Sequence, residues 1–197
     1  MRKVVVFNNL TLDGVMQAPG RPDEDGRGGF QHGGWAFSRM DAVMGQVAAE
    51  GMAQRPDLLF GRRTYEDFFS FWPNQADNPF TPVLNDAVKY VASTTLEEPL
   101  PWSNSVLLDG DAAEAVARLK EEPGKDLLIM GSGELIRSLR LRRRNLIDRY
   151  VLQIHPLLLG PGRRLFAYSD GFTALRLVDT RISTTGVIIA TYGPAAQ

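Results

Sequence analysis

The sequence predicts an α/β domain built around a mixed, mostly parallel sheet. Short apolar, β-branched runs alternate with stretches of helical spacing, which is typical of strands joined by crossover helices. The last two strand-like runs, residues 175–180 and 187–192, are separated only by a turn at residues 183–186. We therefore expect them to pair as an antiparallel hairpin. The chain has no internal repeat and no evident linker, so we expect residues 1–197 to form a single domain.

Eight runs have the composition of buried or half-buried strands. They are residues 3–7, 58–60, 89–92, 105–108, 127–130, 149–154, 175–180 and 187–192. Four stretches have helical spacing or composition, namely the segment around residues 43–52 and residues 64–71, 112–122 and 134–140. Residues 73–82 are expected to be a turn-rich connection. The Gly- and Pro-rich residues 18–34 have the composition of a mobile loop.

Three helix starts carry capping signals. Ser38, followed three residues later by Asp41, fits a capping box, and Thr64 and Asp111 fit the N-cap positions of the next helices. Asp41 also fits a second role, as the general acid of a reaction. The sequence leaves both roles open for Asp41.

Composition excludes several kinds of chemistry. The absence of cysteine excludes disulfides, thiolate catalysis and Cys-ligated metal centres. There are only two histidines, His32 and His155, so we expect no metal site. Lys and Arg total 22 against 23 Asp and Glu, a balance that argues against binding nucleic acid by bulk charge. No segment approaches the roughly 18 apolar residues of a membrane span, so we expect a cytoplasmic protein without a membrane partner.

Three short segments follow predicted strands, at the position where open α/β sheets bind ligands. Residues 61–66 (GRRTYE) combine a glycine turn, a helix start and two arginines, which suits a phosphate. Residues 131–136 (GSGELI) form a second glycine turn before a helix, and residues 92–95 (ASTT) supply hydroxyls. Each segment alone also fits an ordinary connection between elements. If the protein catalyses a difficult reaction, a bound cofactor would supply the chemistry.

Taken together, these segments resemble the dihydrofolate reductase-like superfamily, and within it the branch that contains the reductase domain of bacterial riboflavin biosynthesis. The resemblance is carried by VVVFNNLTLDGVM, LLFGRRTYE, YVAST, LLIMGSGELIRSL and IDRYVLQIHPLLLGPGRRLF, which span nearly the whole chain. It implies a three-layer α/β/α fold, an NADPH cofactor and a homodimer.

The resemblance also implies where NADPH would lie. In this family the first glycine turn and the hydroxyl pair hold the 2′-phosphate side, the second glycine turn holds the pyrophosphate, and the first strand with its following loop frames the nicotinamide. The matching cofactor-binding positions are Asn8, Asn9, Val15, Met16, Gly61, Arg62, Arg63, Thr64, Ser93, Thr94, Gly131, Ser132, Gly133, Glu134 and Leu135. A guanidinium fork suits the additional phosphate that distinguishes NADP from NAD.

The substrate side departs from the family pattern. A tyrosine beside the nicotinamide is replaced by Ile136, a strand threonine by Leu152, and the helix carboxylate is present only as Asp41 near the helix start. These replacements remove hydrogen-bonding groups that would recognise a folate. We therefore expect hydride transfer from NADPH to the C=N or C=O of another small, pteridine- or pyrimidine-like heterocycle.

Several residues keep two interpretations. Trp35 and Phe37 fit either a wall of the substrate pocket or the core, and His32 fits either a closing lid or a solvated loop. The same fold could also serve as a non-catalytic, nucleotide-binding dimeric module.

A basic cluster lies near the end of the last predicted helix. Its members are Arg137, Arg140, Arg142, Arg143 and Arg144. The helix dipole and solvation account for such a cluster, and the balanced charge elsewhere leads us to expect no nucleic-acid partner.

Overall fold

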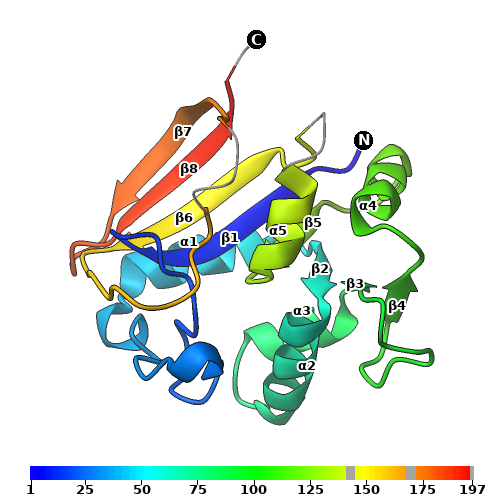
Figure 1. Cartoon of the computed structure of the whole chain (residues 1–197), viewed down its shortest axis with the longest axis horizontal. Coiled ribbons are helices and arrows are strands. Elements are labelled where there is room, and N and C mark those ends of the chain that lie inside the picture. Colours follow the sequence, from blue (N-terminus) through cyan, green and yellow to red (C-terminus); the bar gives the residue numbers. More distant parts are fainter. Residues whose placement is uncertain (141–144, 167–171, 196–197) are drawn as a thin grey trace. The chain divides into compact units, whose positions relative to one another are not determined.

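Eight strands form a mixed sheet in the computed structural model, which describes residues 1–140, 145–166 and 172–195. The order along the sheet is β4-β3-β2-β5-β1-β6-β8-β7 (Figure 1). The strands are β1 (Val4–Thr11), β2 (Asp57–Gly61), β3 (Lys89–Ala92), β4 (Ser105–Leu108), β5 (Leu127–Met130), β6 (Arg149–His155), β7 (Leu175–Ile182) and β8 (Ile188–Pro194). The predicted α/β fold with a mostly parallel sheet and a carboxy-terminal hairpin is confirmed.

Five α-helices accompany the strands in the described part of the chain. They are α1 (Ala42–Ala53), α2 (Arg62–Phe71), α3 (Phe80–Asp86), α4 (Ala112–Glu121) and α5 (Gly133–Arg140). Helix α3 begins within residues 73–82, which the sequence predicts to be a turn-rich connection, and continues past their end. None of the described helices is long and apolar enough to cross a membrane.

Contacts divide the chain into two compact units. Unit 1 consists of Met1–Val5 and Glu50–Asp148, and unit 2 of Val6–Ala49 and Arg149–Gln197. Of the three boundaries between them, one falls within β1, one within α1, and the third directly before β6.

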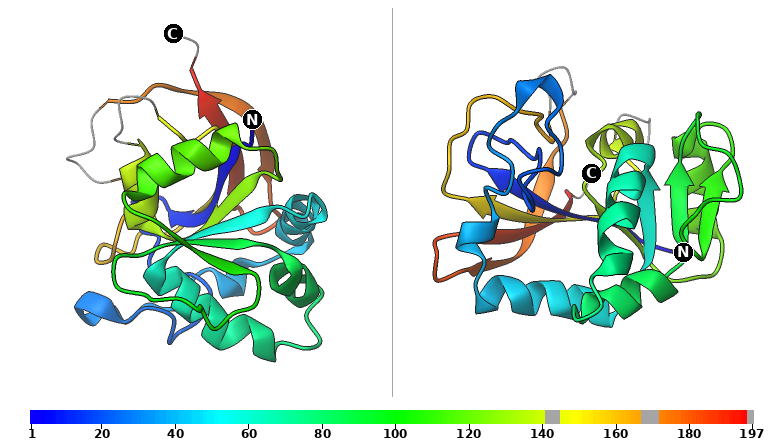
Figure 2. Two further views of the ribbon diagram at one scale, coloured as in Figure 1. Left: turned by 90° about the vertical axis from the view of Figure 1, so that its right-hand side faces the viewer. Right: turned by 90° about the horizontal axis from the view of Figure 1, so that it is seen from below.

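Unit 1 contains the parallel strands. Strand β2 pairs with β3 and with β5, and β3 pairs with β4, all in parallel. Figure 2 shows helices α2 and α3 on one face of these strands and α4 and α5 on the other. The helices cover both faces of β2, since the alternating side chains of Leu58, Leu59 and Phe60 are all at most 1% exposed. This two-sided burial explains why the strands of unit 1 are uninterrupted apolar runs.

Unit 2 contains the antiparallel strands. Strand β8 pairs with β6 on one side and with β7 on the other, and the turn at residues 183–186 joins β7 to β8 as predicted. Helix α1 packs on these strands through Met44, whose side chain clusters with Val187 and Ile189. The unit therefore has its own small core.

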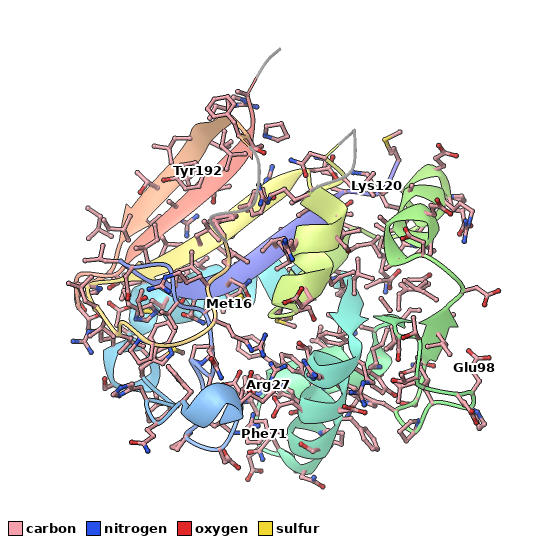
Figure 3. The ribbon with its side chains drawn as sticks, viewed as in Figure 1. Met16, Arg27, Phe71, Glu98, Lys120 and Tyr192 are labelled. Carbon is pink, nitrogen blue, oxygen red and sulfur yellow. The ribbon has the colours of Figure 1, made fainter. Side chains whose placement is uncertain are left out.

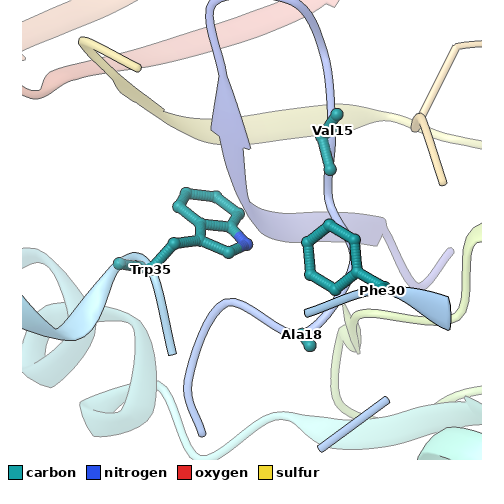
Figure 4. Packing of buried hydrophobic residues seen from close by; sticks show 5 residues of the cluster. Val15, Ala18, Phe30 and Trp35 are labelled. Atoms are coloured by element: carbon teal, nitrogen blue, oxygen red, sulfur yellow. The ribbon is translucent and has the colours of Figure 1, made fainter. Parts of the chain in front are cut away.

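The long Gly- and Pro-rich loop of unit 2 is anchored to the core by two buried residues, Ala18 and Phe30. Ala18 and Phe30 join Val15 and Trp35 in a buried apolar cluster (Figure 4). Gln17 holds the loop from within, since its amide nitrogen donates to the carbonyl oxygens of residues 25 and 27 at 3.0 and 2.9 Å. The segment is thus fixed by apolar burial and by hydrogen bonds to a buried amide.

The capping prediction for α1 is wrong by three residues. Ser38 lies in a short 3₁₀ turn, Phe37–Arg39, and α1 begins at Ala42. Asp41 occupies the N-cap position instead: its Oδ1 accepts from the Met44 amide at 3.0 Å. The Asp111 cap of α4 is confirmed, because its side chain accepts from two amides of the first turn.

Candidate functional site

The three predicted phosphate-contacting segments lie at one edge of unit 1. Strands β3, β2 and β5 are neighbours and parallel, and Gly61 at the end of β2 is in register with Ala92 at the end of β3. The third segment follows Met130, the last residue of β5. Helices α2 and α5 begin at this edge, so that two helix amino termini with their positive dipole ends lie beside each other.

Two hydroxyl groups tie the two helix starts together. The Ser132 amide donates to Thr64 Oγ1 at 3.1 Å, and the Gly61 amide donates to Ser132 Oγ at 2.9 Å. The sequence predicts Thr64 as the N-cap of its own helix, but its hydroxyl oxygen accepts from Ser132 instead. Helix α2 begins two residues earlier, at Arg62, after Gly61 and without a side-chain cap. The first-turn amides of α2 are thereby left for a ligand rather than for a cap.

The turn after β5 requires backbone conformations that only small residues tolerate well. Gly131 has φ of +77°, and a Cβ atom there would lie 3.2 Å from Thr64 Cγ2. Ser132 follows with φ of +58°, an uncommon value for a residue with a side chain. Its carbonyl oxygen accepts the first helical bond of α5, from Ile136 at 3.0 Å. Positive φ at a turn before a helix directs successive amides toward one point, which suits an anion.

Positive charge is available at this edge. Arg62 Nη1 lies 3.5 Å from Glu66 Oε1 on the same helix, and both side chains are about two-fifths exposed. Exposed pairs of this kind contribute little energy. Arg63 is exposed to solvent. A phosphate dianion could therefore recruit either guanidinium at low cost.

The hydroxyl segment after β3 is partly committed to its own turn. Ser93 Oγ accepts from the amides of Thr95 and Leu96 at 3.1 and 3.0 Å, and Thr94 is exposed. At the start of α5, Glu134 is exposed but Leu135 is buried. Leu135 could thus contact a cofactor only through its backbone.

The residues predicted to frame the nicotinamide lie in unit 2. Asn8 is 5% exposed and Asn9 is half-buried, next to each other in β1. Val15 is fully buried and forms an isolated bridge with Arg164, and the Met16 amide donates to the carbonyl of residue 163 at 2.8 Å. Met16 itself is half-buried (Figure 3).

Asp41 is engaged as the N-cap of α1, whereas the sequence predicts it to be either the capping-box partner of Ser38 or a general acid. Besides Met44, it holds Thr184, whose amide and hydroxyl donate to Oδ2 at 2.6 and 2.8 Å. The Met44 amide, followed by the Thr184 groups, lowers the pKa of Asp41 below its ordinary value. A carboxyl group with a lowered pKa holds no proton near neutral pH, so this environment does not favour the predicted role as general acid.

The aromatic candidates separate into a buried and an exposed residue. Trp35 is 8% exposed, and its indole nitrogen donates to the Gln17 carbonyl at 2.7 Å, which places it in the core. Phe37 is 75% exposed. His32 is exposed in its loop, with its ring 5.7 Å from that of Phe30.

The sequence places His155 at the end of a strand, before Pro156, and predicts a structural role for it. It is fully buried at the end of β6, and its Nε2 lies 2.9 Å from Asn9 Oδ1. Burial, reinforced by the charge of Arg39, lowers the pKa of His155 to about 4. The imidazole is therefore neutral near pH 7.

The residues that replace the folate-binding set are core residues. Ile136 is fully buried in α5 and Leu152 is 4% exposed in β6. In the basic cluster, Arg140 is buried, whereas residues 142–144 lie outside the described residues. No group of side chains with metal-ligand character occurs among the described residues.

Comparison with known proteins gives matches over nearly the whole chain. The model of the RibD C-terminal domain matches residues 2–189. The Bacillus subtilis (strain 168) proteins YyaP and YwjB, both uncharacterized, are similar to the chain. YyaP is 27% identical over 97% of this chain and 94% of its own length, and YwjB is 29% identical over 91% of each.

Three solved structures share the fold. A Shewanella sp. PV-4 protein named after riboflavin biosynthesis has a TM-score of 0.73 at 24% identity, covering 98% of this chain and 99% of its own. A pyrimidine reductase-like protein of Corynebacterium diphtheriae has 0.57 at 14%, covering 100% and 93%. Dihydrofolate reductase of Enterococcus faecalis, complexed with NADP(H), has 0.60 at 12%, covering 98% and 97%.

Proposed function

The chain belongs to the RibD C-terminal domain family, and from that premise we propose that it is an NADPH-dependent reductase. It would transfer a hydride to the C=N or C=O of a small heterocycle of the pteridine or pyrimidine type. The observation that carries this proposal is the pair of helix starts tied together by Thr64 and Ser132 at the carboxyl edge of β2 and β5. Such an edge, with two dipole ends and nearby arginines, suits a dinucleotide phosphate.

The residues of unit 1 would hold the phosphates of the cofactor. Arg62 and Arg63 would meet the 2′-phosphate, and the first-turn amides of α2 and α5 would meet the pyrophosphate. Gly131 is small enough to let the backbone approach, since a Cβ would already touch Thr64. The cofactor, when bound, supplies the hydride from its nicotinamide ring, and the protein supplies orientation.

The comparisons support the cofactor and the substrate class. The solved neighbours include a dihydrofolate reductase complexed with NADP(H) and a pyrimidine reductase-like protein. Ile136 and Leu152, which stand where a folate site would carry polar groups, are buried and apolar. Because a site without those groups cannot hydrogen-bond a folate there, we propose a heterocycle other than folate.

A calorimetric titration with NADPH and NADH tests the cofactor assignment. We expect the wild type to bind NADPH more tightly than NADH. Arg62→Gln should weaken NADPH binding by about tenfold or more, the equivalent of one charge-assisted contact, and leave NADH binding unchanged. Arg118→Gln is the matched control, because Arg118 is exposed in the last turn of α4, away from the carboxyl edge.

Two outcomes would contradict the proposal. If neither nucleotide binds more tightly than about 1 mM, the edge is not a nucleotide site. If both bind equally and Arg62→Gln changes both affinities alike, the preference for NADPH is wrong. Following nicotinamide absorbance during incubation with pterin and pyrimidinone compounds then separates a reductase from a module that only binds the nucleotide.

A further inference from the structure

A buried histidine and a half-buried asparagine meet at the ends of two strands of unit 2. His155 is the last residue of β6, and Asn9 lies in β1, two residues before its end. The imidazole Nε2 is 2.9 Å from Asn9 Oδ1. His155 is 0% exposed, so its side chain cannot itself meet a ligand, whereas Asn9 is only partly covered.

The orientation of the imidazole is fixed by the core around it. The Trp35 ring meets it edge-on, with a centroid separation of 5.1 Å and an interplanar angle of 88°. Trp35 is held in turn, because its indole nitrogen donates to the Gln17 carbonyl at 2.7 Å. The His155 ring therefore cannot turn without displacing a buried indole from its hydrogen bond.

The hydrogen-bond requirements of the buried ring determine which atom donates. His155 Nδ1 is buried and has no hydrogen-bond partner among the described residues. If Nδ1 carried the proton, a buried N–H would be left without an acceptor, which is rarer than an unsatisfied acceptor. The proton therefore belongs on Nε2, and Nε2–H donates to Asn9 Oδ1. The alternative, with the amide flipped and Asn9 donating to Nε2, requires the unfavourable tautomer.

The donor set of Asn9 follows from this tautomer. Its amide oxygen is used by His155, so its NH₂ group is turned away from the ring, and none of the described residues accepts from it. We propose that His155 is a positioning residue that sets the Asn9 amide to donate to a carbonyl oxygen of a bound ligand. The ligand chemistry recognised is a planar amide or lactam.

This inference rests on the proposed function, which supplies two sources of such a carbonyl. One is the carboxamide of the nicotinamide, and the other is the lactam of a pterin or pyrimidinone substrate. A donor fixed in this way would reject a ring that presents an N–H at the same position, since two donors would then face each other. The pair would therefore contribute to specificity as well as to binding.

The key variant is Asn9→Asp, which keeps an oxygen for His155 and removes the NH₂ donor. His155→Phe keeps a ring of similar size but leaves Asn9 free to turn, and His155→Gln restores an N–H donor of similar reach. Asn74→Asp is the matched control, because Asn74 is exposed near the end of α2. Circular dichroism melting curves identify any variant that fails to fold, and Asn9→Asp then carries the test.

The ligands are NADP⁺, 2′-phospho-ADP-ribose, which lacks the nicotinamide, and pterin added to the NADP⁺ complex. We expect Asn9→Asp to weaken binding of one amide-bearing ligand by about tenfold or more. His155→Phe should weaken it several-fold and His155→Gln much less. Weakening of NADP⁺ but not of 2′-phospho-ADP-ribose identifies the nicotinamide as the source, and weakening of pterin alone identifies the substrate.

Two results would overturn the inference while leaving the proposed function in place. One is a wild type that binds NADP⁺ together with an Asn9→Asp variant that matches every wild-type affinity. The other is a nitrogen NMR spectrum of labelled histidine that places the His155 proton on Nδ1. A wild type that binds neither nucleotide is a different result, and it refutes the proposed function and with it the ligand assignment of Asn9.

Discussion

The buried His155 should make the fold sensitive to mild acid. Its pKa is lowered from about 6.5 to about 4, chiefly by burial. Between these values the unfolded chain binds a proton at this imidazole that the folded chain does not bind, so the free energy of unfolding falls as the pH falls. The contribution is present above about pH 6.5 and is lost progressively down to about pH 4.

The size of the effect follows from the difference in pKa. A difference of about 2.5 units corresponds to about 3 kcal/mol over the whole range, at about 1.4 kcal/mol per unit. Between about pH 7 and about pH 5, the part of this range that avoids most carboxylate titration, the loss is about 2 kcal/mol. That amount is a large fraction of the stability of an ordinary domain.

Denaturant unfolding of the wild type and of His155→Gln, at several pH values, measures this loss. His155→Gln cannot titrate, so its stability should fall less over the same range. Some carboxylates also have a lowered pKa, so their protonation in acid reduces the free energy of unfolding as well. Examples are Asp13, which accepts from the Thr11 hydroxyl, and Asp25, which is paired with Arg27. They have this effect in both proteins and at lower pH, so the difference between the two proteins isolates the imidazole. A difference that stays constant between about pH 7 and about pH 5 would refute the reasoning.

Two further pairs of substitutions test the packing of unit 1. Gly131→Ala forces a side chain into a φ of +77° and against Thr64, whereas Gly110→Ala meets a similar φ of +72° with nothing within 4 Å. Thermal unfolding should show that Gly110→Ala lowers the free energy of unfolding by about 1 kcal/mol and that Gly131→Ala lowers it further. Only Gly131→Ala should also weaken NADPH binding. Equal losses with unchanged affinity would contradict the close approach at the turn. Lys89 is fully buried, and its ammonium donates to three carbonyl oxygens at 2.8–2.9 Å. Lys89→Met should cost at least about 2 kcal/mol by chemical denaturation, while the exposed Lys125→Met changes little; equal stabilities would show that the ammonium does not hold these carbonyls.

Local signals were sufficient for the strands of the parallel region. The bounds predicted for β3, β4 and β5 match the structure. The signal is clearest for β5, a short apolar run between Asp126 and Gly131. Helix α3 differs from the turn-rich connection that the sequence predicts for residues 73–82. In the structure Pro82 lies in the first turn of α3, where the amide it lacks would have no helical partner. Thr81 further fixes this turn by donating to the Gln75 carbonyl at 2.8 Å.

Capping was less predictable because the partners come from distant segments. Asp41, and not Ser38, is the N-cap of α1. Thr184, which is 143 residues away, donates two hydrogen bonds to the second carboxylate oxygen of Asp41 and so holds it in place. Thr64 likewise accepts from Ser132, 68 residues away, instead of capping its own helix. The capping-box motif depends only on residues three apart in the sequence. It therefore cannot distinguish between two possible N-cap residues when tertiary contacts decide which one caps the helix.

The same limit applies to the candidate site, but the sequence did carry a usable signal there. The contact between Asn9 and His155 joins residues 146 apart, and no local pattern predicts it. Both residues nevertheless follow apolar runs, in VVVFNN and in VLQIH. A polar side chain at such a position is costly to bury unless it is hydrogen-bonded. The two polar positions can therefore be recognised from the sequence, but their pairing follows only from the structure, which makes β1 and β6 neighbours in the sheet. Polar residues that interrupt buried strands in this way are where function is to be expected.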